Sequence, residues 1–325
     1  MSTADAQVSK SRAWLMAARP QTLPAGSAPV IVGAGLAVHA GVFAPLPWLA
    51  ALVGALLIQV GTNFANDYYD AKKGADTDER EGFTRVTAGG IIPAAQVKWA
   101  MIATYGLAVV VGAYLVAIGG VPILVVGLSS IAAGILYTGG PAPYGYRGLG
   151  DLFVFIYFGV VAVTGTYYVQ AVTEASVGLF PMGLPEGTLP LAAIVASLPA
   201  AGLSTAILVV NNVRDKETDA KAGKRTLAVL LGYRWSRVEF LALVGLAYVV
   251  PVAFAFDFSV LALGPDYGLW PLAALLSLPL AASVSRTVMA RSDGEALNPA
   301  LERVGQTLFV HSLLFAAGLA APALL

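Results

Sequence analysis

The sequence predicts an all-α integral membrane protein, with about nine transmembrane helices around a central cavity that opens to the cytoplasm beside two Asp-rich loops. Composition is the first observation: of 325 residues, 58% are hydrophobic and 12% charged, and the mean hydropathy is +0.76. Soluble domains do not have this composition. The second observation is a set of apolar runs long enough to cross a bilayer. The third observation is that the basic residues lie on one side of these runs.

The apolar runs define the expected spans, which centre on residues 22–42, 47–65, 99–118, 121–138, 152–173, 188–210, 238–256, 268–285 and 306–325. Residues 1–21 are expected to be a cytoplasmic N-terminal tail. They do not resemble a cleavable signal, because no short apolar region with a small-residue cleavage site follows Lys10 and Arg12. Residues 22–325 are expected to form a single transmembrane domain.

Charge placement sets the expected orientation. With the N-terminus inside, all 19 Lys and Arg residues fall on the cytoplasmic side, as the positive-inside rule requires. The opposite side keeps only Glu174, Glu186, Asp257 and Asp266. We therefore expect a multi-pass protein of the cell membrane, embedded in the lipid bilayer. The zero net charge gives no preference for nucleic acid, and the absence of Cys excludes disulfides and thiolate chemistry.

Two cytoplasmic loops are long and rich in polar residues, at 63–90 and 209–226. Aligning Asn66 with Asn211 places Asp70 on Asp215, so both loops carry Asn-x-x-x-Asp at the end of an even-numbered span. Two such matches at equivalent topological positions suggest an internal repeat. The register then diverges, because Gly74 stands opposite Asp219.

Residues three, four and seven apart share one face of a helix. Gln59, Asn63, Asn66 or Asp67, and Asp70 follow this spacing in span two. Ser204, Asn211, Asp215 and Asp219 follow it in span six, with an apolar gap at Leu208. Polar side chains in a membrane helix usually face the bundle interior or a wet cavity. Both stripes should therefore line one central pocket. The alternative is that these acids form ordinary solvated helix ends.

Carboxylates and amides one turn apart on two helices suit a hard cation, and magnesium fits best because it is also coordinated by substrate phosphate oxygens. Neither loop contains His, which argues against zinc. The acids are interleaved with basic residues, which favours a metal-bridged di- or polyphosphate. No Gly-x-x-x-x-Gly-Lys-Ser/Thr loop is present, so a nucleoside triphosphate is disfavoured. A diphosphate presented from within a membrane most plausibly belongs to an isoprenoid.

The sequence resembles the UbiA superfamily of intramembrane aromatic prenyltransferases, in particular the 1,4-dihydroxy-2-naphthoate polyprenyltransferases of menaquinone biosynthesis. The resemblance covers nearly the whole chain. It rests on ARPQTLPAGSAPVIVG, ANDYYDAKKGADTDE, GFTRVTAGGI, YTGGPAPYGYRGLGDLFVF, NNVRDKETDAKAGKRTLAV and LNPALERVGQTLF. The two Asp-rich loops mark the superfamily, whereas YRGLGD, GKRTLAV and the Arg-Pro-x-Thr-Leu-Pro opening indicate the naphthoate branch.

The resemblance implies roles for residues that match the family motifs. The implied magnesium ligands are Asn66, Asp67, Asp70, Asp76, Asn211, Asp215 and Asp219, with Asp78 a further candidate. Asp70, Asp215, Lys73 and Arg85 are the implied catalytic residues. Arg147, Lys224, Arg225, Tyr146 and Asn63 are the implied substrate-binding residues. For Arg147, a positive-inside anchor paired with Asp151 is an equal alternative. Tyr68, Tyr69, Tyr144 and Tyr146 could stabilise an allylic cation, but interfacial aromatics are more often belt residues.

The implied reaction is transfer of a polyprenyl group from polyprenyl diphosphate to 1,4-dihydroxy-2-naphthoate, with loss of diphosphate and carbon dioxide, giving demethylmenaquinone. Decarboxylation would replace a strong base, which agrees with a sequence that contains only two His. His311, within span nine, is expected to form a helix-to-helix hydrogen bond instead of a catalytic contact. Two alternatives remain open here: the same chemistry on 4-hydroxybenzoate, homogentisate, haem or chlorophyllide, and a secondary transporter.

Overall fold

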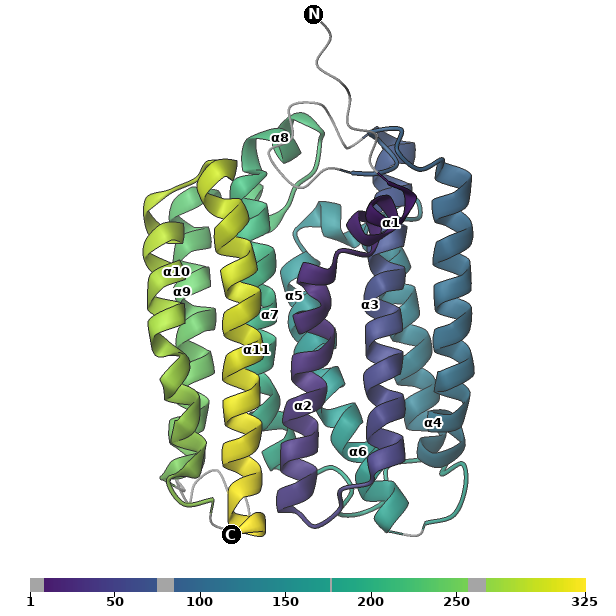
Figure 1. Cartoon of the computed structure of the whole chain (residues 1–325), viewed down its shortest axis with the longest axis vertical. Helices are drawn as coiled ribbons and strands as arrows, with labels where there is room; N and C mark the ends of the chain where they lie inside the picture. The colour runs from purple at the N-terminus through teal and green to yellow at the C-terminus, as the bar shows by residue number, and fades with distance from the viewer. Residues whose placement is uncertain (1–8, 75–84, 176, 257–266) are drawn as a thin grey trace, which may run out of the picture.

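The computed structural model describes residues 9–74, 85–175, 177–256 and 267–325, and all of its elements are helical (Figure 1). The first half contains α1 (Lys10–Ala18), η1 (Pro20–Thr22), α2 (Leu23–His39), α3 (Pro45–Lys73), α4 (Ala94–Leu136), η2 (Tyr144–Arg147), α5 (Gly150–Phe155), η3 (Ile156–Val161) and α6 (Ala162–Glu174). The second half contains α7 (Leu191–Arg214), α8 (Lys216–Lys221), α9 (Leu227–Ala255), η5 (Trp270–Ser277), α10 (Leu278–Ala290) and α11 (Gly294–Leu324).

The membrane-spanning architecture predicted from the apolar runs is confirmed. Eight helical stretches in the described part of the chain are long and apolar enough to cross a membrane. One of them, α4, accounts for two of the expected spans, because Gly120 interrupts it with a φ of 63° and a ψ of −147°. The chain folds back there, because Tyr105 and Gly134, on opposite sides of Gly120, lie side by side: a Cβ added at Gly134 would lie 2.5 Å from the Tyr105 hydroxyl.

Helix α7 lies at the centre of the bundle, where it packs against α2, α5, α9 and α11. Small residues permit this close approach, as is common between membrane helices. A Cβ added at Gly202 would lie 2.6 Å from the carbonyl oxygen of Leu243 on α9. Helix α3 packs against α4 on the other side of the molecule and also contacts α2 and α6. The C-terminal ends of α3 and α7 both border one interior space, which Asn66 and Asn211 line.

Part of the expected N-terminal tail is helical and packs on the bundle. Residues 10–18 form α1, whose Ser9 cap accepts from the backbone N–H of Arg12. Ala13 and Ala17 are buried, and the ring of Trp14 meets Phe64 of α3 edge-on at 5.9 Å. Alanines four residues apart give α1 one small apolar face that packs on α3. In Figure 1, α1 lies at the same end of the bundle as α8, and the C-terminus lies at the opposite end.

Candidate active site

Two adjoining cavities occupy the space between α3 and α7. The larger has a volume of about 570 Å³, and its wall is mostly apolar. The smaller, of about 50 Å³, is polar and lies beside the ends of α3 and α7. Asn66, Arg85, Tyr137 and Asn211 line both. The two spaces thus form one site, with a polar end and an apolar body.

The polar cavity brings the two Asp-rich motifs together. Its wall includes Asn66 and Asp70 from α3, and Asn211, Asp215 and Asp219 from α7 and α8. The helical spacing seen in the sequence accounts for this, because each motif places its amide and carboxylate one turn apart on the inward face. The predicted convergence of the two stripes on one pocket is what the structure shows.

Each carboxylate of the polar cavity has a basic partner. Arg85 contacts Asp70 Oδ2 at 3.2 Å, and Lys224 lies 3.5 Å from Asp219 Oδ1. Asp70, Asp219 and the third acid of the cavity, Asp215, are all buried. A buried carboxylate needs compensating charge or hydrogen bonds. The basic side chains compensate the acids of the polar cavity in this arrangement.

Arg214 is a residue of the site that the sequence reasoning did not select. Its Nε and Nη2 atoms donate to the two oxygens of Asp215 at 2.8 and 2.7 Å. Nη2 also donates to Asn211 Oδ1 at 2.7 Å, and Nη1 donates to Asn298 Oδ1 on α11 at 2.8 Å. The planar guanidinium suits this fork geometry. Arg214 thereby ties the second motif to the Leu-Asn-Pro segment of α11, a role that its position beside Asp215 could have suggested.

Tyr146 connects the two motifs across the polar cavity. Its hydroxyl donates to Asp70 Oδ1 at 2.5 Å. Its ring centroid lies 5.3 Å from Lys73 Nζ and 4.9 Å from Lys224 Nζ. Its carbonyl oxygen accepts from the backbone N–H of Arg225 at 2.9 Å. Tyr146, in the 137–147 connection, therefore contacts residues of both Asp-rich loops.

Three predicted site residues do not line the polar cavity. Asp67 is buried but lines neither cavity, and its Oδ2 accepts from the hydroxyl and backbone N–H of Thr87 at 2.6 and 3.2 Å. Lys73 donates to the carbonyl oxygens of Thr138 and Gly140 at 2.6 and 3.1 Å. Asn63 borders the apolar cavity, and its Nδ2 donates to Ala18 and Thr22 at 2.9 Å each. These three residues hold chain segments around the site.

Arg147 and Arg225 are exposed and line neither cavity. Asp76 and Asp78 lie outside the described residues. Their predicted roles, like those of the other site residues, stay predictions. His311 is buried, and its Nε2 lies 2.9 Å from the carbonyl oxygen of Ala247 on α9, which agrees with the expected helix-to-helix contact.

Tyr137 and Tyr144 line the larger cavity. Burial raises the pKa of Tyr137 well above its usual value, and a nearby Asp151 raises it further. Burial likewise raises the pKa of Tyr144, whose hydroxyl donates to the carbonyl oxygen of Ala133 at 2.8 Å. Both phenols therefore stay protonated at neutral pH and are unsuited to act as bases.

The polar end fits a magnesium site by the chemistry of its donors. Asp70, Asp215 and Asp219 supply carboxylates, and Asn66 and Asn211 supply amide oxygens, which are the ligand types that magnesium prefers. Among the described residues, no three acidic or His side chains converge into a metal site by themselves.

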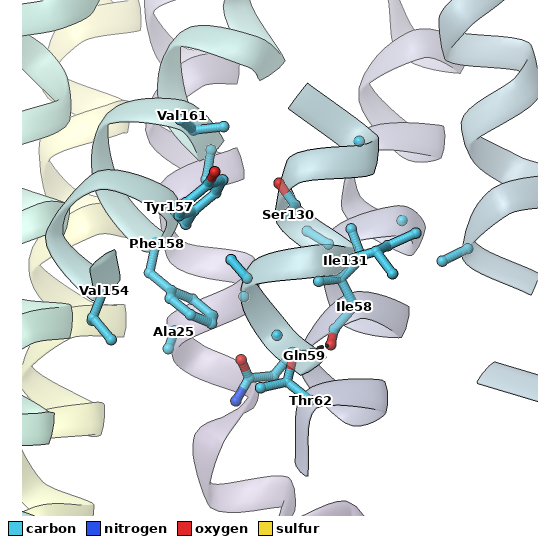
Figure 2. Close-up of a pocket in the computed structure, with 18 of the residues that line it drawn as sticks. Ala25, Ile58, Gln59, Thr62, Ser130, Ile131, Val154, Tyr157, Phe158 and Val161 are labelled. Carbon is cyan, nitrogen blue, oxygen red and sulfur yellow. Dashed lines mark hydrogen bonds between the residues drawn. The ribbon is translucent and has the colours of Figure 1, made fainter. Parts of the chain in front are cut away.

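The apolar body of the site is formed by α2, α3, α4, η3, α6 and α7. Figure 2 shows Tyr157, Phe158 and Val161 on one side of the pocket, facing Ile58, Ser130 and Ile131 across it. The first three belong to η3, a π-helical turn between α5 and α6. Such turns are frequent at functional sites because they redirect side chains out of the regular helical register.

Comparison with known proteins agrees with this geometry. Residues 27–313 match the UbiA prenyltransferase family. A 1,4-dihydroxy-2-naphthoate octaprenyltransferase of Escherichia coli (strain K12) is 38% identical, covering 96% of both chains. A protein of the same description from Mycobacterium tuberculosis is 37% identical, covering 94% of this chain and 96% of its own.

Solved structures share the fold. A UbiA homologue from Aeropyrum pernix K1, in its apo form, superposes with a TM-score of 0.62 at 14% identity, covering 92% of this chain and 97% of its own. One from Archaeoglobus fulgidus, bound to DMAPP and Mg²⁺, superposes with a TM-score of 0.56 at 15% identity, covering 93% of this chain and 98% of its own.

Proposed function

Because the chain belongs to the UbiA prenyltransferase family, we propose that it transfers a polyprenyl group from polyprenyl diphosphate to 1,4-dihydroxy-2-naphthoate in the cell membrane. The single observation that carries the proposal is the union of a polar cavity, walled by both Asp-rich motifs, with an apolar cavity of about 570 Å³. A diphosphate suits the first and a hydrocarbon chain with a flat aromatic ring suits the second. Full-length relatives that are 37–38% identical and described as naphthoate octaprenyltransferases support the choice of acceptor.

Magnesium at the polar end would be held by Asp70, Asp215 and Asp219, with Asn66 and Asn211 as amide ligands. When bound, it neutralises charge that develops on the departing diphosphate. DMAPP and Mg²⁺ in the Archaeoglobus fulgidus structure support this assignment. Arg85 and Lys224 line the same cavity, and their donors suit the remaining phosphate oxygens through charge-assisted hydrogen bonds.

The chemical step joins the allylic carbon of the donor to the carboxyl-bearing carbon of the naphthoate. The allylic carbon–oxygen bond breaks, and diphosphate leaves with that electron pair. The ring supplies the electrons of the new carbon–carbon bond. The carboxylate then leaves as carbon dioxide, and its bonding pair restores the aromatic ring, so no residue has to remove a ring proton. The step therefore does not need Tyr137 or Tyr144, whose raised pKa keeps both phenols protonated, to act as a base.

The apolar wall serves the reaction by excluding water from the activated donor. The larger cavity is lined by side chains such as Val116, Leu128 and Phe158, which offer no competing nucleophile. Low-dielectric surroundings also strengthen the ionic contacts at the polar end. The polar groups gather at one end of the bundle, whereas secondary transporters place their sites near the bilayer midplane. This arrangement argues against the transporter alternative.

We further propose that the polar end faces the cytoplasm, together with α1 and the N-terminus. The support is that every Lys and Arg falls on this side of the expected spans. The donor and the acceptor would thus both reach the site from the cytoplasmic half of the membrane.

The test of the function uses carboxyl-labelled 1,4-dihydroxy-2-naphthoate and a long-chain prenyl diphosphate, with the protein in liposomes that contain magnesium. We expect labelled carbon dioxide in an amount equal to the released diphosphate, and a prenylated product without label. Retention of the label in the product would contradict the coupled decarboxylation. Turnover with 4-hydroxybenzoate but not with naphthoate would contradict the acceptor and leave the family assignment standing.

A further inference from the structure

Gln59 is a polar residue placed in the apolar body of the site. It belongs to α3, lines the larger cavity and has an exposed fraction of 6%. Its Oε1 atom is buried without a hydrogen-bond partner. Figure 2 shows its carboxamide pointing into the pocket, toward the side on which Ala25 and Phe158 lie. Helix α2 lies close beside Gln59, because a Cβ added at Gly26 would lie 3.4 Å from Gln59 Cβ.

The neighbouring polar residues of the same cavity do not share this property. Thr62 Oγ1 donates to the carbonyl oxygen of Ile58 at 2.8 Å, a contact drawn in Figure 2. Thr166 Oγ1 donates to the carbonyl oxygen of Ala162 at 2.7 Å. Such i−4 contacts satisfy hydroxyls within their own helix. A glutamine carboxamide that lies free in a cavity instead offers both a donor and an acceptor to a ligand.

A hydrocarbon chain is the wrong ligand for this group. Burying an amide against it without a hydrogen bond costs about 1–3 kcal/mol, as judged from protein mutations. The ligand part beside Gln59 should therefore carry a polar atom. Gln59 lies seven residues before Asn66 on α3, which corresponds to about 10 Å along the helix. Since Asn66 borders the polar cavity, Gln59 lies deeper than the diphosphate position by roughly the length of a fused ring system.

We propose that Gln59 recognises the C4 hydroxyl of the naphthoate acceptor, an inference that rests on the proposed function. The C1 hydroxyl lies next to the acceptor's own carboxylate and donates to it, whereas the C4 hydroxyl has no such internal partner. That hydroxyl donates to Gln59 Oε1, the atom that has no partner in the protein. The hydrogen bond then fixes which edge of the ring turns toward the polar cavity.

In this role Gln59 sets the specificity for the acceptor and is not a catalytic residue. The C4 hydroxyl does not push electrons directly onto the attacked C2 carbon, whereas the C1 hydroxyl does. 1-Hydroxy-2-naphthoate therefore keeps the groups that the reaction needs and lacks only the group that Gln59 binds. A site built to hydrogen-bond a hydroxyl discriminates against an analogue without it, because the protein group is then left unpaired.

The experiment compares both acceptors with the parent protein in magnesium-containing liposomes and a long-chain prenyl diphosphate. We expect kcat/KM to be at least about tenfold higher for 1,4-dihydroxy-2-naphthoate, from one hydrogen bond of ordinary strength. Equal use of the two acceptors by the parent would overturn the inference while leaving the proposed function intact. Failure of the parent to prenylate either naphthoate would overturn the proposed function itself, and the inference with it.

Substitutions at Gln59 then test whether its side chain causes the preference for 1,4-dihydroxy-2-naphthoate. Gln59→Leu and Gln59→Met keep an apolar group of similar volume and remove the amide. Each should lose most of the tenfold preference, raise the KM for the dihydroxy acceptor and leave the donor KM within about twofold. The matched control is Gln170→Leu, because Gln170 is a fully buried glutamine that does not line the cavity; it should keep the parental preference. Full preference retained in either Gln59 variant would overturn the inference.

Discussion

The hydroxyl of Tyr146 donates a hydrogen bond of 2.5 Å to Oδ1 of Asp70. The opposite oxygen of the same carboxylate accepts from Arg85 at 3.2 Å. Asp70 is therefore oriented from two sides by residues that lie outside α3. The 137–147 connection is therefore part of the polar cavity. Because the hydroxyl of Tyr146 contacts Asp70 whereas its ring contacts Lys73 and Lys224, substitutions can test the two groups separately.

Tyr146→Phe should lower kcat/KM about tenfold and Tyr146→Ala should lower it further. The first change removes a hydrogen bond to a charged group, which contributes about 1.5–3 kcal/mol, but keeps the ring beside Lys73 and Lys224. The second removes both. Initial rates at saturating magnesium measure the effect. Tyr68→Phe, on α3 and outside both cavities, is the control; an equal loss there would contradict the specific role of Tyr146.

Asp70→Asn and Asp215→Asn should each reduce transfer more than about a hundredfold and raise the magnesium concentration needed for half-maximal rate. Each change removes one carboxylate from a site that has few protein ligands. Chelation of magnesium should abolish activity in the parent, and added magnesium should restore it. Titration of the rate with magnesium is the measurement. A variant with the parental rate and the parental titration midpoint would disprove the two-motif site.

Asp67→Asn should behave differently although it lies in the same motif. Its Oδ2 accepts from the Thr87 hydroxyl and N–H, so its loss should loosen the 85–90 turn. We expect a lower melting temperature and a magnesium midpoint close to that of the parent. Thr87→Val, which removes only the hydroxyl partner, should lower the melting temperature in the same direction. A large shift of the magnesium midpoint in Asp67→Asn, without loss of thermal stability, would instead make Asp67 a metal ligand.

Lys224→Met should weaken use of the donor more than Arg225→Met does, although the two residues are adjacent. Lys224 is buried, lines the polar cavity and lies 3.5 Å from Asp219 Oδ1. Arg225 is exposed and contacts Tyr146 through its backbone N–H. We expect the donor KM to rise about tenfold or more in the first variant and about twofold or less in the second. The reverse order would place Arg225 at the diphosphate.

The orientation can be tested with single cysteines, because the parent has none. Ala220→Cys lies in α8 beside the polar cavity, and Met182→Cys lies in the connection between α6 and α7; both positions are exposed. A membrane-impermeant thiol reagent should label Met182→Cys in intact cells and Ala220→Cys only in inside-out vesicles. Labelling of both sites from the same side would contradict the proposed topology.

The sequence predicted those site residues whose positions follow from the spacing of an α-helix. Asn66, Asp70, Asn211 and Asp215 could be assigned to one pocket because each pair lies one turn apart at the end of an apolar span. Periodicity could not separate Asp67 from Asp70, since both lie within one turn of Asn66. Their hydrogen-bond partners distinguish them, and those partners, Thr87 and Tyr146, come from other segments.

The sequence by itself determined that the chain is a helical membrane protein with two matched Asp-rich motifs, because hydropathy and residue spacing are local properties. Only the tertiary structure decided that Arg214 joins Asp215 to α11 through Asn298, and that Gln59 faces a cavity with its Oε1 atom unpartnered. Each of these depends on which helices become neighbours. That choice is made by side-chain packing between segments far apart in the chain, which no local pattern records.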